Sequence, residues 1–381
     1  MAVIPERIMK FSQGKTKLYT NFIDLFHHYR DVNGIENKRR HLEYMKTKKV
    51  GDNVQELSLD YKEKKFNKLL QDTIAEYANV KDFSSLPAEV WATNPNYKWA
   101  TFAVVGSLID VVLPETMIDS VGLYTQVLNG DLNDSFAFTL KSDDLFAVTR
   151  AGKGKRHTEV QKDFAGQQTL ITYEHDITVQ ASLIRVLCGQ ESLAEFTMKA
   201  IRSIEREMNL DVYYALVKGL EALPTPPTAD VNGFLRISGY TQKAAMHIAD
   251  TVSAYNGKPA IFLGTREACS QILPDNANYR YDIDSEFARL GYAQTMFGTD
   301  VMIMPQVPDI DNKYKLLLDP KKIYVISPSS DKLIKLGITG ATRPITDAPY
   351  DNANLTQSAT FKKDWGVGFI TNSIAGEIDL A

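Results

Sequence analysis

The chain has 381 residues, of which 44% are apolar and 24% are charged, close to the averages of folded globular proteins. The two cysteines, Cys188 and Cys269, lie far apart in sequence, so we expect neither a disulfide framework nor a zinc site. No apolar run approaches the roughly 18 residues of a membrane-spanning helix, and the N-terminus lacks the features of a secretory signal. We therefore expect about two compact units, made in the cytoplasm and without membrane contact.

The net charge of −4 is unevenly distributed. Residues 1–70 hold 15 Lys and Arg against 9 Asp and Glu, which leaves 28 against 38 for residues 71–381. An acidic body repels a phosphate backbone, whereas a basic segment can lie along an acidic neighbour or contact nucleic acid. A solvated helical surface explains the basic segment equally well. Its main basic residues are Lys38, Arg39, Arg40, Lys46, Lys48 and Lys49.

The first 95 residues are predicted to form an arm with two helices, Tyr19–Tyr29 and Lys62–Tyr77, separated by polar connections. The triplet that begins at Asn94 is a turn signal and ends the arm. The density of apolar residues then rises from Phe102 to Leu113. We expect Pro114 to end that element, because proline disrupts a helix interior.

Alternation of apolar and polar residues predicts a long β-hairpin from about Ser135 to Ala181. One arm begins with Phe136 and Phe138, and the other includes the alternating stretch Ile171–Val179. Two isolated strands are marginally stable in water, so we expect this ribbon to lie on another molecule. A basic, glycine-rich segment joins the arms and carries Lys153, Lys155, Arg156 and His157.

The strongest helix prediction covers Ser192–Ala222. Its first residues, Ser192 to Glu195, fit a capping box, and apolar residues recur at helical spacing until Pro224. At about 1.5 Å per residue such a helix extends roughly 45 Å, which suits a spine that crosses the molecule. The segment Thr225–Thr228, with two prolines, is predicted to be a stiff connector to a second unit.

The second unit alternates helical and strand patterns, which predicts a sheet covered by helices. Its predicted helices are Thr241–Tyr255, Arg266–Ile272 and one near Ser285–Tyr292, and its predicted strands are Ala260–Leu263, Val301–Met304, Lys315–Leu318 and Lys322–Ile326. Two further strands follow, Leu333–Gly337 and Ser358–Ile370, and we expect Gly366 and Gly368 to interrupt the second. The overall prediction is an α+β fold.

No complete catalytic motif is present. Gly14-Lys15-Thr16 resembles the end of a phosphate-binding loop, but Met9 stands where that loop needs glycine. The acids Asp282, Asp284 and Glu286 resemble the start of a calcium loop, but Phe287 occupies the place of its glycine. We therefore predict no catalytic residues, no metal and no cofactor.

Taken in order, these elements form a pattern: a basic arm, an extended hairpin, a long spine helix, a proline-marked entry into an α+β unit, and late return strands. The chain resembles the major capsid proteins of tailed bacteriophages, whose Hong-Kong-97-type fold is shared with encapsulins. The resemblance covers roughly residues 95–381. It is most specific at Phe146–Ala181 followed by Leu183–Leu223, and at Lys322–Pro328 followed by Trp365–Ile370.

The resemblance implies a structural protein, not an enzyme, whose copies form the hexamers and pentamers of an icosahedral shell around double-stranded DNA. The hairpin tip and the basic arm would then contact adjacent subunits, with Lys153, Lys155, Arg156 and His157 meeting acidic groups. The implied domains are an N-terminal arm (1–95), a peripheral domain (96–134, with the spine helix 182–228 and the return strands 330–365), an extended loop (135–181) and an axial domain (229–329 and 366–381).

The resemblance also implies further partners: scaffolding, portal and decoration proteins, and packaged DNA in loose, non-specific contact. The expected location is the virion. An encapsulin-type compartment that encloses enzymes is the alternative within the same fold. Two alternatives belong to other classes: an enzyme whose site is assembled from distant residues, such as Asp282, Asp284 and Glu286, and a nucleic-acid-binding protein that uses residues 1–70.

Overall fold

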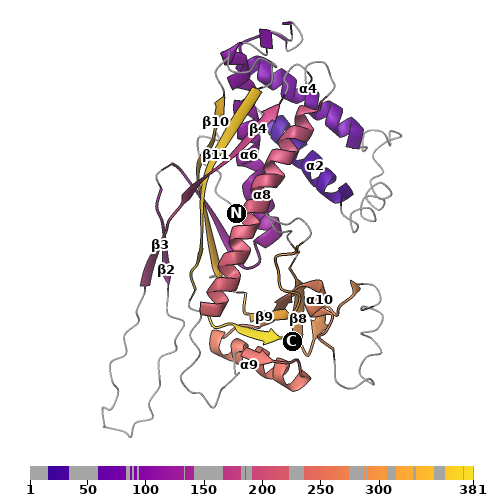
Figure 1. Ribbon diagram of the computed structural model, residues 1–381, viewed down its shortest axis with the longest axis vertical. Coiled ribbons are helices and arrows are strands. Elements are labelled where there is room, and N and C mark those ends of the chain that lie inside the picture. The colour runs from indigo at the N-terminus through magenta and orange to yellow at the C-terminus, as the bar shows by residue number, and fades with distance from the viewer. Residues whose placement is uncertain are drawn as a thin grey trace, which may run out of the picture.

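Helices and strands are mixed throughout the computed structural model, which confirms the predicted α+β class. They form two bodies stacked along the long axis of the molecule (Figure 1). The structure describes residues 16–33, 59–82, 86–87, 90–91, 94–132, 134–140, 166–181, 185, 191–222, 236–273, 287, 290–304, 306, 315–328, 332–346, 357–371 and 373–380.

The larger body is built on a four-stranded sheet, here called the long sheet. Its strand order is β1 (Thr125–Gly130), β10 (Ile334–Thr346), β11 (Gln357–Phe369) and β4 (Tyr173–Ala181). Strand β1 runs parallel to β10, and the other neighbours are antiparallel. Strands β10 and β11 have 13 residues each, which corresponds to about 43 Å at 3.3 Å per residue.

Helix α8 (Leu193–Ala222) runs along this sheet and confirms the predicted spine. Its 30 residues give a length of about 45 Å, similar to that of the two long strands. The hydroxyl of Ser192 accepts a hydrogen bond from the backbone N–H of Glu195 at 3.3 Å, as the capping box predicts. The carboxylate of Glu195 pairs with Lys199 one turn later.

Helix α6 (Pro95–Val121) is the central helix of the larger body. Within the described ranges it is the one helix long and apolar enough to cross a membrane, a property that we did not expect from the sequence. Its most apolar stretch is 72% buried in the molecule, as in the core helix of a soluble domain. Pro114 lies inside α6 and does not end it, contrary to prediction. Met117 and Val121 continue the buried face, and their packing offsets the lost backbone hydrogen bond.

Helix α2 (Thr16–Asn33) packs against α6, and helix α4 (Leu59–Tyr77) packs against α6 and α8 of the same chain. The rings of Phe22 and Phe66 join α2 to α4 with centroids 4.7 Å apart. Asn67 of α4 accepts a hydrogen bond from the Ala194 N–H at the first turn of α8. The apolar faces of these two helices are therefore buried within the chain, and the contact of the arm with adjacent subunits stays a prediction. The buried residues are Leu18, Tyr19, Phe22, Leu25, Phe26, Phe66, Leu70, Ile74 and Ala75.

Strands β2 (Phe136–Leu140) and β3 (Gly166–Leu170) form an antiparallel pair, here called the ribbon. Strand β4 does not continue it, contrary to the prediction of one hairpin over residues 135–181. Instead β4 pairs with β11, with Tyr173 opposite Trp365. The apolar face of the ribbon was expected to need another molecule, but here Phe136, Phe138 and Leu170 are buried together with Ile370.

Two glycines allow the ribbon to lie on the long sheet. Gly337 of β10 and Gly366 of β11 are directly opposite each other. A Cβ atom on Gly337 would collide with the ring of Phe136, and one on Gly366 would collide with the carbonyl oxygen of Ile171. Strand β11 continues through Gly366 and Gly368, so the predicted interruption is wrong; the glycines serve close packing.

The smaller body contains a six-stranded sheet with its own apolar core. The predicted strand Lys315–Leu318 is wrong: no strand spans these residues, and the Leu318 backbone instead bonds the side chain of Gln306. The predicted helix near Ser285–Tyr292 lies mostly outside the described residues. The strand order is β5 (Arg236–Ser238), β12 (Gly376–Asp379), β9 (Lys322–Ile326), β6 (Ile261–Gly264), β8 (Thr299–Ile303) and β7 (Thr295–Met296), flanked by α9 (Gln242–Asn256) and α10 (Arg266–Cys269).

The chain passes between the two bodies three times. It leaves the larger body after α8, builds the smaller one from β5 to β9, and returns to the long sheet as β10 and β11. Strand β12 then brings the C-terminal segment back to the six-stranded sheet (Figure 1). The two bodies are therefore linked by several crossings.

Candidate functional site

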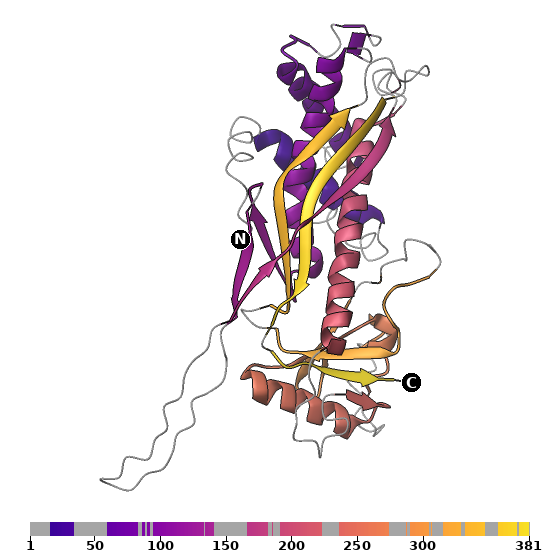
Figure 2. The ribbon, with the colours of Figure 1, turned by 60° about the vertical axis from the view of Figure 1, so that its left-hand side comes forward.

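The long sheet has one face covered by helices and one face without them (Figure 2). Half of the second face is covered by the ribbon, which packs over Gly337, and by the residues after it, where Ile171 lies over Gly366. The other half carries polar and charged side chains from β4, β10 and β11.

Four charged residues form a network on the uncovered half. Lys362 Nζ lies 3.0 Å from Glu174 Oε1, and Arg343 lies 3.1 Å from Asp364 and 3.5 Å from Glu174. The hydrogen bond and charge of Lys362 lower the pKa of the exposed Glu174 carboxyl. The charges compensate each other across three strands, so the network adds a modest stabilisation to the pairing of these strands.

The helix-facing side contains a buried ion pair. Lys363 of β11 donates to Asp110 of α6 and to the carbonyl of Gly340, both at 2.6 Å. A register shift in the β10–β11 ladder lies between Thr339 and Arg343. Within this interval the N–H and hydroxyl of Thr342 turn toward Asp110 and donate to its carboxylate. This network joins α6, β10 and β11.

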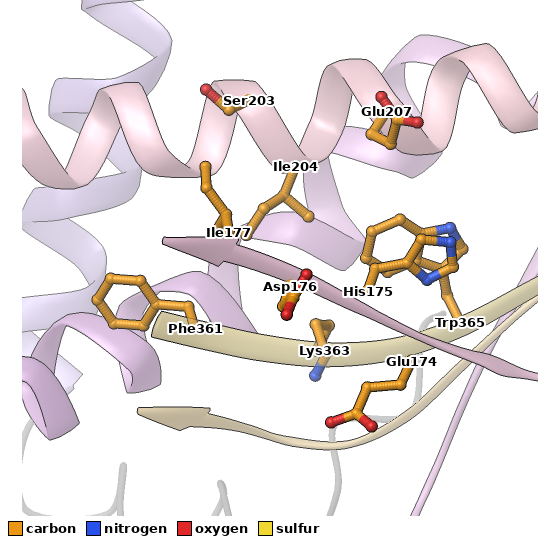
Figure 3. A pocket seen from close by; sticks show the side chains of 10 residues that line it. All are labelled: Glu174, His175, Asp176, Ile177, Ser203, Ile204, Glu207, Phe361, Lys363 and Trp365. Atoms are coloured by element: carbon orange, nitrogen blue, oxygen red, sulfur yellow. The ribbon is translucent and has the colours of Figure 1, made fainter. Parts of the chain in front are cut away.

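A cavity of about 360 Å³ lies between β4, β11 and α8. Figure 3 shows that its walls come from these three elements. They present both apolar and polar groups, as small-molecule sites do. The residues that line the cavity are Glu174, His175, Asp176, Ile177, Ser203, Ile204, Glu207, Phe361, Lys363 and Trp365.

An aromatic pair stands at one end of the cavity (Figure 3). The rings of His175 and Trp365 are stacked, with centroids 3.6 Å apart and planes 6° apart. The indole N–H of Trp365 donates to Asp211 at 2.9 Å, and His175 Nε2 lies 3.8 Å from the same carboxylate. Asp211 of α8 therefore connects the helix to both strands.

Glu207 lies one turn before Asp211 on α8 and contributes a carboxylate to the cavity wall. Burial and the neighbouring Asp211 raise the pKa of Glu207, whereas His175 and Arg206 act in the opposite direction with less effect. The rise shows that the charged form of Glu207 is less well compensated than it would be in water.

Ser203 of the cavity wall and Cys269 of the smaller body are not placed as activated nucleophiles. Ser203 donates its hydroxyl to the carbonyl of Lys199, so its oxygen is not paired with a base. Burial raises the pKa of the Cys269 thiol to about 12, which suppresses the reactive thiolate. Among the described residues, no three His, Cys, Asp or Glu side chains gather in a way that could hold a metal ion.

The residues that the sequence proposed for assembly lie outside the described part of the chain. These are Lys153, Lys155, Arg156 and His157 of the hairpin tip and Lys38, Arg39, Arg40, Lys46, Lys48 and Lys49 of the basic segment. The acids Asp282, Asp284 and Glu286 also lie outside it. Their roles remain predictions.

Sequence reasoning missed the buried pair and the cavity. One signal was available for the pair, because Asp110 is the single charged residue between Ala100 and Leu113, a run that is otherwise mainly apolar. A lone acid in such a run predicts a buried partner. The sequence did not indicate that this partner is Lys363, which lies 253 positions away.

Comparison of the amino-acid sequence finds no matching protein-family model and no matching curated protein. Solved structures of similar shape include the mature capsid of bacteriophage PhiM1, with 11% identity over 68% of this chain and 85% of that chain and a TM-score of 0.44. The capsid of a native GTA particle is 12% identical over 69% of this chain and 90% of that chain, with a TM-score of 0.44. The head of Helicobacter pylori bacteriophage KHP40 is 11% identical over 67% of this chain and 89% of that chain, with a TM-score of 0.42.

Proposed function

We propose that this chain is the structural subunit of a closed icosahedral shell, of the kind built by the major capsid proteins of tailed bacteriophages. The observation that carries the proposal is the order in which the chain builds its two bodies. The ribbon and β4 precede the long helix α8, the six-stranded sheet follows, and β10 and β11 return beside β4. This is the order of elements on which the sequence resemblance rests.

The division into domains follows from the same order. The long sheet with α6 and α8 corresponds to the peripheral domain, and the six-stranded sheet with α9 corresponds to the axial domain. We place the last boundary after Phe369 instead of after residue 365, because β11 extends to Phe369. The proposed arm, residues 1–95, includes α2 and α4, which pack on the peripheral domain of the same chain.

The uncovered surfaces support contact between copies. Ile171 and Tyr173, where the chain turns from β3 into β4, are 66% and 64% exposed. Exposed large apolar side chains are favourable contacts when a partner covers them. In the proposed shell the basic hairpin tip, with Lys153, Lys155, Arg156 and His157, meets the acidic body of a neighbouring copy. Scaffolding, portal and decoration proteins are further proposed partners.

The charge distribution supports a DNA-filled shell in the virion. Residues 71–381 carry ten more acidic than basic side chains. A predominantly acidic body repels the phosphate backbone, so packaged double-stranded DNA would contact the shell loosely and without sequence preference. The basic N-terminal residues would serve contacts between subunits.

The first experiment is negative-stain microscopy with light scattering on the full chain, produced alone and together with an adjacent scaffolding gene. We expect closed shells, tubes or six-membered rings in at least one of the two preparations. A monodisperse monomer or dimer in both would contradict the proposal. The contents of shells purified from the native source distinguish a genome-filled capsid from a compartment that holds enzymes.

A further inference from the structure

We propose that the cavity between β4, β11 and α8 is a binding site for an organic cation that carries an alkylammonium or guanidinium group. This inference does not depend on the proposed shell function. It rests on the volume of the cavity, on its apolar walls, and on the carboxylate of Glu207.

The volume and the apolar walls of the cavity favour an organic molecule over a metal ion as its occupant. Its volume of about 360 Å³ is within the range of sites for small organic molecules. Ile177, Ile204 and Phe361 supply apolar wall, which no hydrated metal ion would favour. These side chains suit the hydrocarbon part of an alkylammonium ion.

The polar groups of the cavity favour a positive charge. Glu207 on α8 lines it and makes no ion pair among the residues that the structure describes. Asp176 lies opposite Lys362 in the β4–β11 ladder, so its carboxylate is on the other face of the sheet. The raised pKa of Glu207 agrees with a partly buried carboxylate next to Asp211, whose charge His175 and Arg206 do not fully offset. A ligand ammonium placed beside Glu207 would supply the missing charge and form charge-assisted hydrogen bonds.

The cations already present are held elsewhere. The Lys363 ammonium is bound to Asp110 and to the Gly340 carbonyl, so that residue contributes mainly its hydrocarbon stem to the cavity. Lys362 is paired with Glu174 on the other face of the sheet. His175 is stacked on Trp365 beside Asp211. Arg206 and His175 act on the Glu207 carboxyl, but with less effect than burial and Asp211. The balance of charge beside Glu207 therefore favours a cationic ligand over an anionic one.

Two probes test the proposal and separate two sources of the cation. 1,4-Diaminobutane represents a free polyamine, and Nα-acetyl-lysine methylamide represents a lysine side chain supplied by another protein chain. Binding to the full-length chain is measured by isothermal titration calorimetry at pH 7. We expect saturable binding of at least one probe, and the probe that binds more tightly identifies the source.

Three variants locate the binding. Glu207→Gln removes the charge and should weaken binding by about tenfold or more. Ser203→Leu adds volume at the cavity wall on α8 and should reduce binding comparably. Glu195→Gln is the control, because Glu195 lies on the same helix, outside the cavity, and pairs with Lys199.

Circular dichroism of each variant checks that the fold is retained. Absence of saturable binding of both probes to the unaltered chain would overturn the proposal. Equal binding by the unaltered chain, Glu207→Gln and Ser203→Leu would also overturn it. If either cavity variant does not fold, the other still decides the result, since each acts on the cavity by a different means.

Discussion

The ammonium nitrogen of Lys363 lies 2.6 Å from Oδ1 of Asp110, and the two side chains are only 5% and 3% exposed. Asp110 also accepts hydrogen bonds from the N–H and hydroxyl of Thr342. One carboxylate on the central helix therefore holds both long strands. Buried ions of this kind are stable only when every partner is present.

Removal of one partner should destabilise the chain strongly. Lys363→Met leaves the Asp110 carboxylate buried without its counter-ion, and we expect a loss of about 3–5 kcal/mol in the free energy of unfolding. Lys199→Met is the control, because Lys199 pairs with Glu195 at the surface and such pairs contribute about 0.3–0.5 kcal/mol. Urea unfolding followed by circular dichroism measures both. Similar losses in the two variants would show that the buried pair has no special role.

Gly366 should not tolerate a side chain. A Cβ atom there would meet the backbone carbonyl of Ile171, so Gly366→Ala should cost about 1–3 kcal/mol through displacement of the chain between the ribbon and β4. Gly106→Ala is the matched control on α6, where a Cβ would make ordinary contacts with Thr342. In a helix that change stabilises by up to about 1 kcal/mol. Thermal unfolding of both variants checks the opposite signs.

The effect of Glu207 on stability should depend on pH. Because its pKa is raised above the ordinary value of 4.5, the folded state binds the proton more tightly than the unfolded state. The charged carboxylate therefore lowers stability above the folded pKa, and this penalty vanishes below the unfolded pKa. We expect Glu207→Gln to be more stable than the unaltered chain at pH 7, with the difference shrinking as the pH falls toward about 4. Urea unfolding at several pH values measures the stability difference between the two chains. A difference that stays constant between pH 7 and about pH 4 would show that the pKa of Glu207 is not raised in the folded chain.

Cys269 should be inert in the folded chain. Burial raises its thiol pKa to about 12, so almost no thiolate exists at pH 8. We expect iodoacetamide to modify Cys269 slowly in the native protein and rapidly in denaturant, as measured by mass spectrometry of the peptide that contains it. Equal rates under both conditions would show that the thiol is accessible in the folded state.

Deletion of Gly152–Thr158 should separate folding from assembly. The segment lies beyond the β2–β3 pairing that anchors the ribbon, so the melting temperature of the unassembled chain should stay unchanged while light scattering shows impaired assembly. A second variant removes the charge of the tip without changing its length. It carries Lys153→Ser, Lys155→Ser, Arg156→Ser and His157→Ser. If the deleted chain unfolds before any assembly, the tip belongs to the core and its assigned role in assembly is wrong.

Local patterns in the sequence were sufficient for the individual elements. The apolar spacing and the cap at Ser192 placed α8 correctly, and the same logic found α9, β6 and β9. These signals are local because helical and strand periodicity show which face of an element is apolar. They supported the α+β class and the order of elements on which the proposed function rests.

Only the tertiary structure decided what covers each apolar face. Strand β4 has the pattern of a ribbon arm but pairs with β11, and α2 and α4 pack within their own chain. Pro114 remains inside α6 because residues far away in sequence bury the turns beyond it. The cavity and the pair between Asp110 and Lys363 likewise join distant segments. Periodicity identifies a face to be buried, but the partner is chosen by competition among all surfaces of the folded chain.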